Sequence, residues 1–119
     1  MVNAAPSYIP DRGHVVWMTL DPQAGHEQAG RRPAIVLSPA SYNRLTGLAI
    51  CCPISGRVKG YIFEVPLPTG LPVSGVVLAD HAKSLDWRAR RADTICDLPQ
   101  EITTTVLARL VALLSGDDT

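Results

Sequence analysis

Short apolar runs separated by glycine and proline fill most of this chain, and they limit the folds that it can adopt. Residues 14–20 are rich in β-branched and aromatic side chains, and residues 33–37 form a continuous apolar run. Runs of this length between turn residues are typical of β-strands. We expect further strands at residues 48–53, 61–67, 75–78 and 92–96. Residues 21–32 are polar and contain two glycines, which indicates a long loop.

Two helical segments complete the expected fold. Residues 38–43 begin with residues that favour a helix start, and Gly47 would end one short helical turn. Later, Asp97 can cap a helix, Pro99 suits its first turn and Gln100 can complete a capping box. Apolar residues at helical spacing follow as far as Gly116, namely Ile102, Val106, Leu110, Leu113 and Leu114.

These elements predict a mainly β fold. Five or more short strands followed by one amphipathic helix indicate a small SH3-like barrel with the C-terminal helix packed on it. With 119 residues the chain can build one modest core, so we expect a single domain over residues 1–119. The segments 1–9 and 117–119 are expected to be flexible.

Composition and segment lengths indicate a cytoplasmic protein. No apolar run approaches the roughly 20 residues that cross a bilayer, so no membrane association is expected. Residues 1–6 lack the basic start and apolar stretch of a secretory signal. Three cysteines, two of them adjacent at Cys51 and Cys52, do not form a disulfide framework. The cysteines, with His14 and His81, lack the spacing of a zinc site, and we predict neither a metal nor a cofactor.

Charge is unevenly distributed along the chain. The net charge is zero, but residues 31–91 hold nine basic and three acidic side chains, a local charge of +6. The two flanks carry the balancing acids. A basic middle can form a phosphate-binding face on a neutral protein, although solvated surface charges would give the same pattern.

The segment GHEQAGRRPAIVLS at residues 25–38 resembles the signature of MazF/PemK-type toxins. Similar blocks follow in the family's order at residues 42–43, 53–55, 59–64, 75–80 and 83–90. The resemblance covers nearly the whole chain and implies a MazF/PemK/CcdB-type barrel. It also implies a homodimeric toxin that cleaves single-stranded RNA within short sequence motifs, arrests growth and is neutralised by a cognate antitoxin, with DNA binding by the antitoxin complex.

The resemblance places the catalytic residues at Arg32, Ser55 and Glu27. Arg32 offers a planar cation for two phosphate oxygens, and Ser55 adds a hydroxyl toward the same phosphate. Glu27 is the simplest general base for the RNA 2′-hydroxyl, and His26 beside it could share proton transfer. Close relatives commonly carry threonine where this chain has Ser55, and residues 56–58 also depart from the family pattern. The cleavage sequence therefore cannot be inferred from the family.

Other basic residues are expected to line the RNA path. Those assigned to RNA binding, together with His26, are Arg31, Arg57, Lys59, Lys83, Arg88 and Arg90. Trp87 lies near this basic cluster, and a core or dimer contact is favoured for it over base stacking.

Two alternative functions stay open at this point. One is a toxin-like barrel that binds a protein target, as gyrase poisons do. Those toxins end in Trp-Gly-Ile, whereas residues 115–119 here read SGDDT, which disfavours this alternative. The other is a non-catalytic binding barrel, and the presence of Glu27, Arg32 and Ser55 together argues against it.

Overall fold

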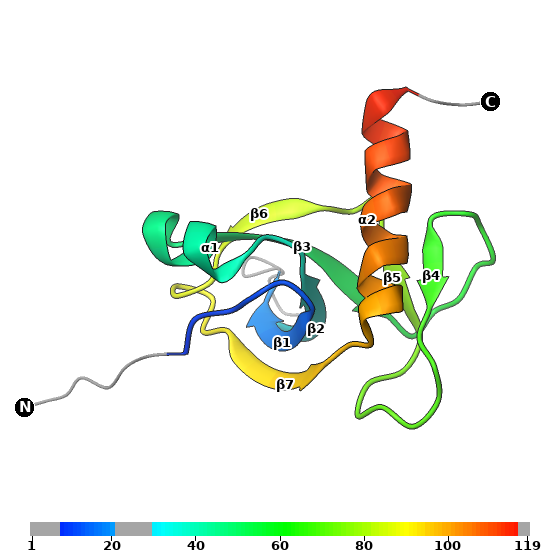
Figure 1. Cartoon of the computed structure of the whole chain (residues 1–119). Helices are drawn as coiled ribbons and strands as arrows, with labels where there is room; N and C mark the ends of the chain where they lie inside the picture. The colour runs from blue at the N-terminus through cyan, green and yellow to red at the C-terminus, as the bar shows by residue number, and fades with distance from the viewer. Residues whose placement is uncertain (1–7, 21–29, 117–119) are drawn as a thin grey trace, which may run out of the picture.

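A computed structural model of the chain describes residues 8–20 and 30–116. In chain order its elements are β1 (His14–Thr19), β2 (Arg31–Val36), α1 (Ala40–Thr46), β3 (Leu48–Ser55), β4 (Glu64–Pro66), β5 (Val76–Leu78), β6 (Lys83–Asp86), β7 (Asp93–Asp97) and α2 (Gln100–Ser115). The strands pair antiparallel in the order β4-β5-β3-β2-β1-β7, and β6 pairs with β3. α2 stands beside β4 and β5 (Figure 1). The expected mainly β fold with a short helix and a C-terminal helix is confirmed.

The central strands are buried on both faces, which creates two apolar clusters. In β2, Ile35 belongs to the first cluster, and its neighbours Ala34 and Val36 belong to the second. Successive side chains of a strand point to opposite faces, so one apolar run supplies both clusters. α2 covers the first cluster with Val106, which is fully buried. The continuous apolar character of residues 33–37 is the consequence of this double burial.

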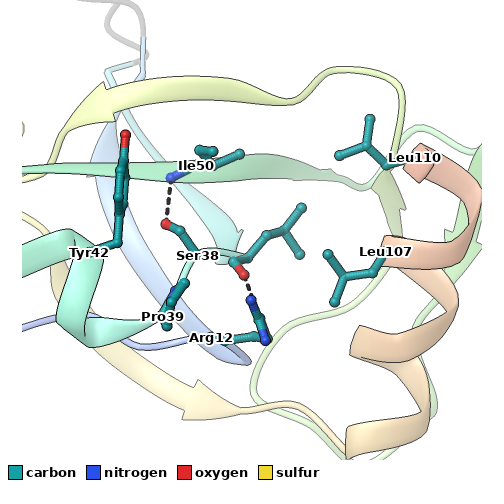
Figure 2. Close-up of a pocket in the computed structure, with 8 residues that line it drawn as sticks. Arg12, Ser38, Pro39, Tyr42, Ile50, Leu107 and Leu110 are labelled. Carbon is teal, nitrogen blue, oxygen red and sulfur yellow. Dashed lines mark hydrogen bonds between the residues drawn. The ribbon is translucent and has the colours of Figure 1, made fainter. Parts of the chain in front are cut away.

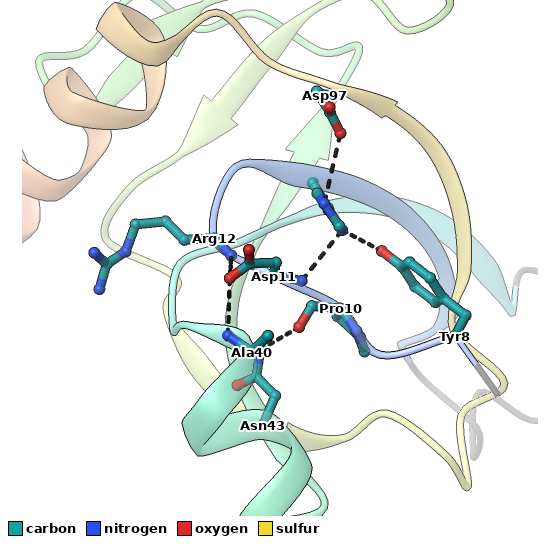
Figure 3. A network of polar contacts seen from close by, with 8 residues as sticks. Tyr8, Pro10, Asp11, Arg12, Ala40, Asn43 and Asp97 are labelled. Carbon is teal, nitrogen blue, oxygen red and sulfur yellow. Dashed lines mark hydrogen bonds and ion pairs between the residues drawn. The ribbon is translucent and has the colours of Figure 1, made fainter. Parts of the chain in front are cut away.

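Asn43 joins α1 to the sheet and to the second cluster. Its buried side chain donates hydrogen bonds to the carbonyl oxygens of Pro10 (2.8 Å) and Ser38 (2.9 Å) and accepts one from the Ser38 hydroxyl (2.6 Å). Figure 3 shows the bond to Pro10. The Asn43 carbonyl accepts a hydrogen bond from Trp87 Nε1 at 3.0 Å. Trp87 is only 3 % exposed, so the expectation of a core contact is confirmed and its ring faces are closed to RNA bases.

Several strand limits differ from the sequence prediction. β2 begins at Arg31 because Arg31 and Arg32 pair with Thr19 and Met18 of β1, so the predicted loop of residues 21–32 extends too far. The rest of that loop, residues 21–29, lies outside the described residues. β3 continues to Ser55, which pairs with Val76. The fourth strand is shorter than expected, because residues 61–64 turn and the Glu64 amide bonds to the Tyr61 carbonyl at 3.0 Å.

The strand β6 was not predicted from the sequence. Its four residues are mostly exposed, and only Leu85 is buried. Pairing with residues 48–51 of β3 makes this segment a strand. Tyr8 and Ile9, at the end of the segment expected to be flexible, pack against the second cluster.

Neither helix begins with the cap that the sequence suggested. Asp97 is the last residue of β7, and α2 has Pro99 at its N-cap with no side-chain hydrogen bond. α1 receives its cap from outside the helix, because Asp11 Oδ1 accepts the Ala40 amide at 2.8 Å. Both helix ends agree with the prediction: Gly47 and Gly116 adopt the left-handed conformation with φ of 74° and 70°. Neither of the described helices is long and apolar enough to span a membrane.

Candidate functional site

The neighbouring ends of β2 and β3 carry the two described residues of the predicted catalytic set. Ala34 of β2 pairs with Pro53 of β3, and Arg32 and Ser55 each lie two residues beyond this last pair of the ladder. Arg32 lies on the same face of β2 as Ala34, and Ser55 lies on the same face of β3 as Pro53. Arg32 is exposed and Ser55 is partly buried. Arg32 near the start of β2 and Ser55 at the end of β3 thus put a guanidinium and a hydroxyl at the same end of this strand pair.

Beyond Ser55 the surface forms a hollow of about 140 Å³. It is lined by Ser55, Arg57, Lys59, Tyr61, Glu64, Leu78 and His81. Three of these residues were assigned to catalysis or RNA binding from the sequence: Ser55, Arg57 and Lys59. The structure brings these three together and adds Tyr61, Glu64 and His81, which sequence reasoning had not assigned to the site.

Glu64 fixes the basic segment of this hollow. Its carboxylate is 6 % exposed and accepts backbone amides from Lys59 (3.0 and 3.1 Å) and Gly60 (2.7 Å). At the other end of the segment, the Arg57 amide donates to Ser55 Oγ at 3.0 Å. Arg109 of α2 donates a further hydrogen bond to the carbonyl of Ile62. The segment that presents Arg57 and Lys59 is thus held at both ends.

A second, smaller hollow of about 60 Å³ lies on the Arg32 face of the sheet. Its lining residues are Leu20, Ala34, Cys51, Pro53, His81, Lys83 and Leu85. Lys83, a predicted RNA-binding residue, belongs to this hollow, and His81 lines both hollows. The sequence signal that could have assigned His81 to the site is the adjacent pair Asp80 and His81 after the strand at residues 75–78. Sequence reasoning examined His81 only as a metal ligand.

Three predicted RNA-binding arginines have other contacts in the structure. Arg31 Nη1 donates to the Arg90 carbonyl at 3.0 Å, and Arg90 Nη1 donates to the Thr19 carbonyl at 2.7 Å. Both side chains connect β-strands to the turn before β7. The Arg88 guanidinium lies 4.7 Å from the centroid of a Trp87 ring. Glu27 and His26 lie outside the described residues.

The site contains a tyrosine whose ionisation is suppressed. Desolvation, with Asp80 and Glu64 nearby, raises the pKa of Tyr61 above its ordinary value. Its hydroxyl donates to Asp80 Oδ1 at 3.5 Å. Tyr61 is therefore a neutral hydrogen-bonding group at physiological pH. Among the described residues, no group of three or more His, Cys, Asp or Glu side chains is arranged to hold a metal ion.

A larger hollow elsewhere in the molecule has a different character. It measures about 490 Å³ and lies between α1, β3 and α2, lined mainly by apolar side chains such as Tyr42, Ile50 and Leu107 (Figure 2). Arg12, the one charged residue among the described residues that line it, donates from Nε to the Leu37 carbonyl at 2.6 Å. Of the residues that the sequence assigned to the site, none of those described lines this hollow.

Comparison with known proteins identifies the family of the chain. Residues 11–114 match the family described as PemK-like, MazF-like toxin of type II toxin–antitoxin system. The Endoribonuclease toxin MazF of Escherichia coli (strain K12) is 45% identical over 107 residues, which cover 90% of this chain and 96% of that protein. Endoribonuclease PemK of Escherichia coli is 34% identical over 110 residues, covering 88% of this chain and 82% of that protein.

Solved structures give the same assignment. MazF from Deinococcus radiodurans superimposes with a TM-score of 0.84 at 58% identity, covering 92% of this chain and 99% of that one. A MazE–MazF structure from the same organism matches with a TM-score of 0.83 at 51% identity, covering 92% and 98%. From residue 11 to residue 114, the chain belongs to the PemK-like, MazF-like toxin family of type II toxin–antitoxin systems.

Proposed function

We propose that this chain is a toxin endoribonuclease that cleaves single-stranded RNA at a short sequence motif without a metal ion or the ribosome. The observation that supports the proposal is that Arg32 and Ser55 lie at the neighbouring ends of the paired strands β2 and β3. The basic hollow beside them, with Arg57 and Lys59, suits a phosphate backbone. Relatives named as endoribonucleases, at 34% and 45% identity, support the same activity.

RNA supplies its own nucleophile for this reaction. The 2′-hydroxyl attacks the adjacent phosphorus, the bond to the 5′-oxygen breaks, and the products carry a 2′,3′-cyclic phosphate and a 5′-hydroxyl. Arg32 can bind two phosphate oxygens and stays cationic throughout, which favours the charge of the crowded transition state. Ser55 offers a hydroxyl to the same phosphate, and Glu27 acts as the base that accepts the 2′ proton.

The same proposal covers the partners of the chain. A two-fold homodimer would bind RNA across its interface, and a cognate antitoxin would cover the basic face and silence the enzyme. The MazE–MazF structure at 51% identity supports an antitoxin partner. An RNA substrate and three free cysteines suit the reducing cytoplasm.

Incubation of the purified protein with a long single-stranded RNA in EDTA tests the activity. We expect cleavage at one recurring motif, with cyclic phosphate ends, and its loss in Arg32→Ala. A folded Arg32→Ala variant that cleaves as fast as the parent would disprove the role of Arg32. No cleavage of any RNA by the folded parent would favour the alternative, a toxin-like barrel that acts by binding a protein.

A further inference from the structure

One titratable side chain connects the two hollows beside Ser55. His81 lines the hollow that contains Ser55, Arg57 and Lys59, and it also lines the hollow that contains Ala34 and Lys83. Among the residues that the structure describes, His81 alone lines both of these hollows. An RNA phosphate that reaches Ser55 in the first hollow would therefore lie close to the imidazole.

The turn between β5 and β6 holds His81 in a defined orientation. The His81 amide donates to the Leu78 carbonyl at 3.0 Å. On the side chain, Nε2 lies 3.7 Å from Asp80 Oδ1, and the same carboxylate oxygen accepts the Tyr61 hydroxyl at 3.5 Å. Among the described residues, none forms a hydrogen bond with Nδ1 of His81. The ring thus has one nitrogen beside a carboxylate and the other nitrogen available to a ligand.

The charges around His81 come from four segments of the chain. Asp80 lies in the same turn, with its Oδ1 3.7 Å from His81 Nε2. Arg57 and Lys59 of the loop before β4 and Glu64 of β4 line one of the two hollows with His81, and Lys83 of β6 lines the other. The two hollows therefore present both signs of charge around the ring.

We propose that His81 is a catalytic residue of the RNA cleavage, acting as the general acid. The protonated imidazole donates its Nδ1 proton to the 5′-oxygen as the P–O5′ bond breaks. The 2′-oxygen forms the new P–O2′ bond, and its proton passes to the base. The neutral imidazole then regains a proton from water. This inference rests on the proposed endoribonuclease activity and adds the group that protonates the leaving oxygen.

A pH profile of single-turnover cleavage separates this role from a structural one. General acid catalysis contributes on the order of 100-fold or more, so we expect a loss of about that size in His81→Gln and His81→Asn. Because the protonated ring is the active form, the parent's rate should fall toward alkaline pH. That alkaline fall should be absent in both variants.

The chain offers a matched control in His14. It too lies 3.7 Å from an aspartate, Asp97, but on β1 and outside both hollows. His14→Gln should keep the parental rate and pH profile. His81 is an exposed residue whose side chain makes no buried hydrogen bond, so the His81 variants should keep the parental fold. Their circular dichroism spectra should therefore match that of the parent.

A modified substrate gives the decisive comparison. In an RNA with sulfur in place of the 5′-oxygen at the cleavage site, the departing thiolate needs no proton. His81→Gln should then cleave within a few-fold of the parent, although it is slow on ordinary RNA. Equal slowing on both substrates, or an unchanged pH profile, would overturn the role of His81 while leaving the endoribonuclease intact. A parent protein that cleaves neither RNA would overturn both proposals.

Discussion

The Arg90 guanidinium donates a hydrogen bond from Nη1 to the carbonyl oxygen of Thr19 at 2.7 Å, across 71 positions of sequence. Backbone contacts accompany it, because the Thr19 amide bonds to the Arg90 carbonyl at 3.2 Å. Arg31 Nη1 donates to the same carbonyl at 3.0 Å. The two arginines thus join the end of β1 and the start of β2 to the turn before β7. The sequence had predicted that Arg31 and Arg90 line the RNA path. In the structure their guanidinium groups instead connect strands to the turn before β7.

Arg90→Ala should therefore destabilise the fold as well as slow cleavage. Loss of a charge-assisted hydrogen bond to a partly buried carbonyl costs about 1–3 kcal/mol. Urea unfolding measures the free energy of unfolding directly. Arg88→Ala is the control, because the Arg88 side chain is exposed and lies over the Trp87 ring instead of bonding to β1 or β2. Equal unfolding midpoints for Arg90→Ala and the parent would contradict this prediction.

Glu64→Gln should loosen the segment that carries Arg57 and Lys59. The buried carboxylate accepts the amides of Lys59 and Gly60, and a glutamine side chain can replace only one of its two acceptor oxygens. We expect a loss of about 1–3 kcal/mol in the free energy of unfolding, with a raised KM for RNA. Thermal unfolding and steady-state cleavage provide the measurements.

Glu101→Gln serves as the matched control for Glu64, since Glu101 is exposed in the first turn of α2. This variant should change stability by less than about 0.5 kcal/mol. If Glu64→Gln bound and cleaved RNA like the control, the carboxylate would have no part in holding the basic segment.

Gly75→Ala should displace Ser55. A Cβ atom at residue 75 would overlap the Ser55 carbonyl oxygen and lie 2.9 Å from its carbonyl carbon, and φ there is 115°. Both effects act at once, so we expect a loss of more than about 2 kcal/mol in stability and a strong fall in cleavage. Gly70→Ala separates the two effects, because φ is 94° but the Cβ would meet open space.

The Gly70→Ala variant should lose only about 1–2 kcal/mol from backbone strain and should cleave RNA normally. Denaturant unfolding and the cleavage rate of both variants decide the comparison. Similar effects of the two substitutions on cleavage would show that contact with Ser55 is unimportant.

Stability should fall at alkaline pH because two thiols are buried. Burial raises the pKa of Cys51 and of Cys52 from 9.0 to about 12. Above pH 9 the unfolded chain releases these protons and the folded chain keeps them, so the free energy of unfolding decreases as pH rises from about 9 toward about 12. The limiting slope is about 1.4 kcal/mol per pH unit for each thiol.

Urea unfolding between pH 8 and pH 10 measures this slope. Cys52→Ala should reduce the slope of the free energy of unfolding against pH. Below pH 8 the Cys52 thiol is protonated in both the folded and the unfolded chain and contributes no pH dependence. The same burial should keep Cys51 and Cys52 unreactive toward iodoacetamide until the protein unfolds. A pH-independent stability over this range would contradict the assignment.

The sequence alone determined the strand-rich core and the C-terminal helix. It also predicted which residues carry the chemistry, through the resemblance to a toxin family. The short apolar and β-branched runs of β1 to β3 and the helical spacing in α2 are local patterns, and local patterns can be recognised without a structure. The resemblance of residues 25–38 to a toxin family placed Arg32, and the block at residues 53–55 placed Ser55. These positions required no knowledge of distances.

Tertiary structure decided what surrounds those residues. β6 is a strand because β3 lies beside it, and α1 is capped by Asp11, which lies 29 positions away from Ala40. Glu64 turns inward to the amides before β4, and His81 reaches the hollow of Ser55 through the β3–β5 pairing. Apart from those of Glu64, whose partners lie four and five positions away, these contacts join segments distant in sequence. Local preferences carry no information about such distant partners, so only the folded chain brings the Ser55 hydroxyl and the His81 imidazole to one hollow.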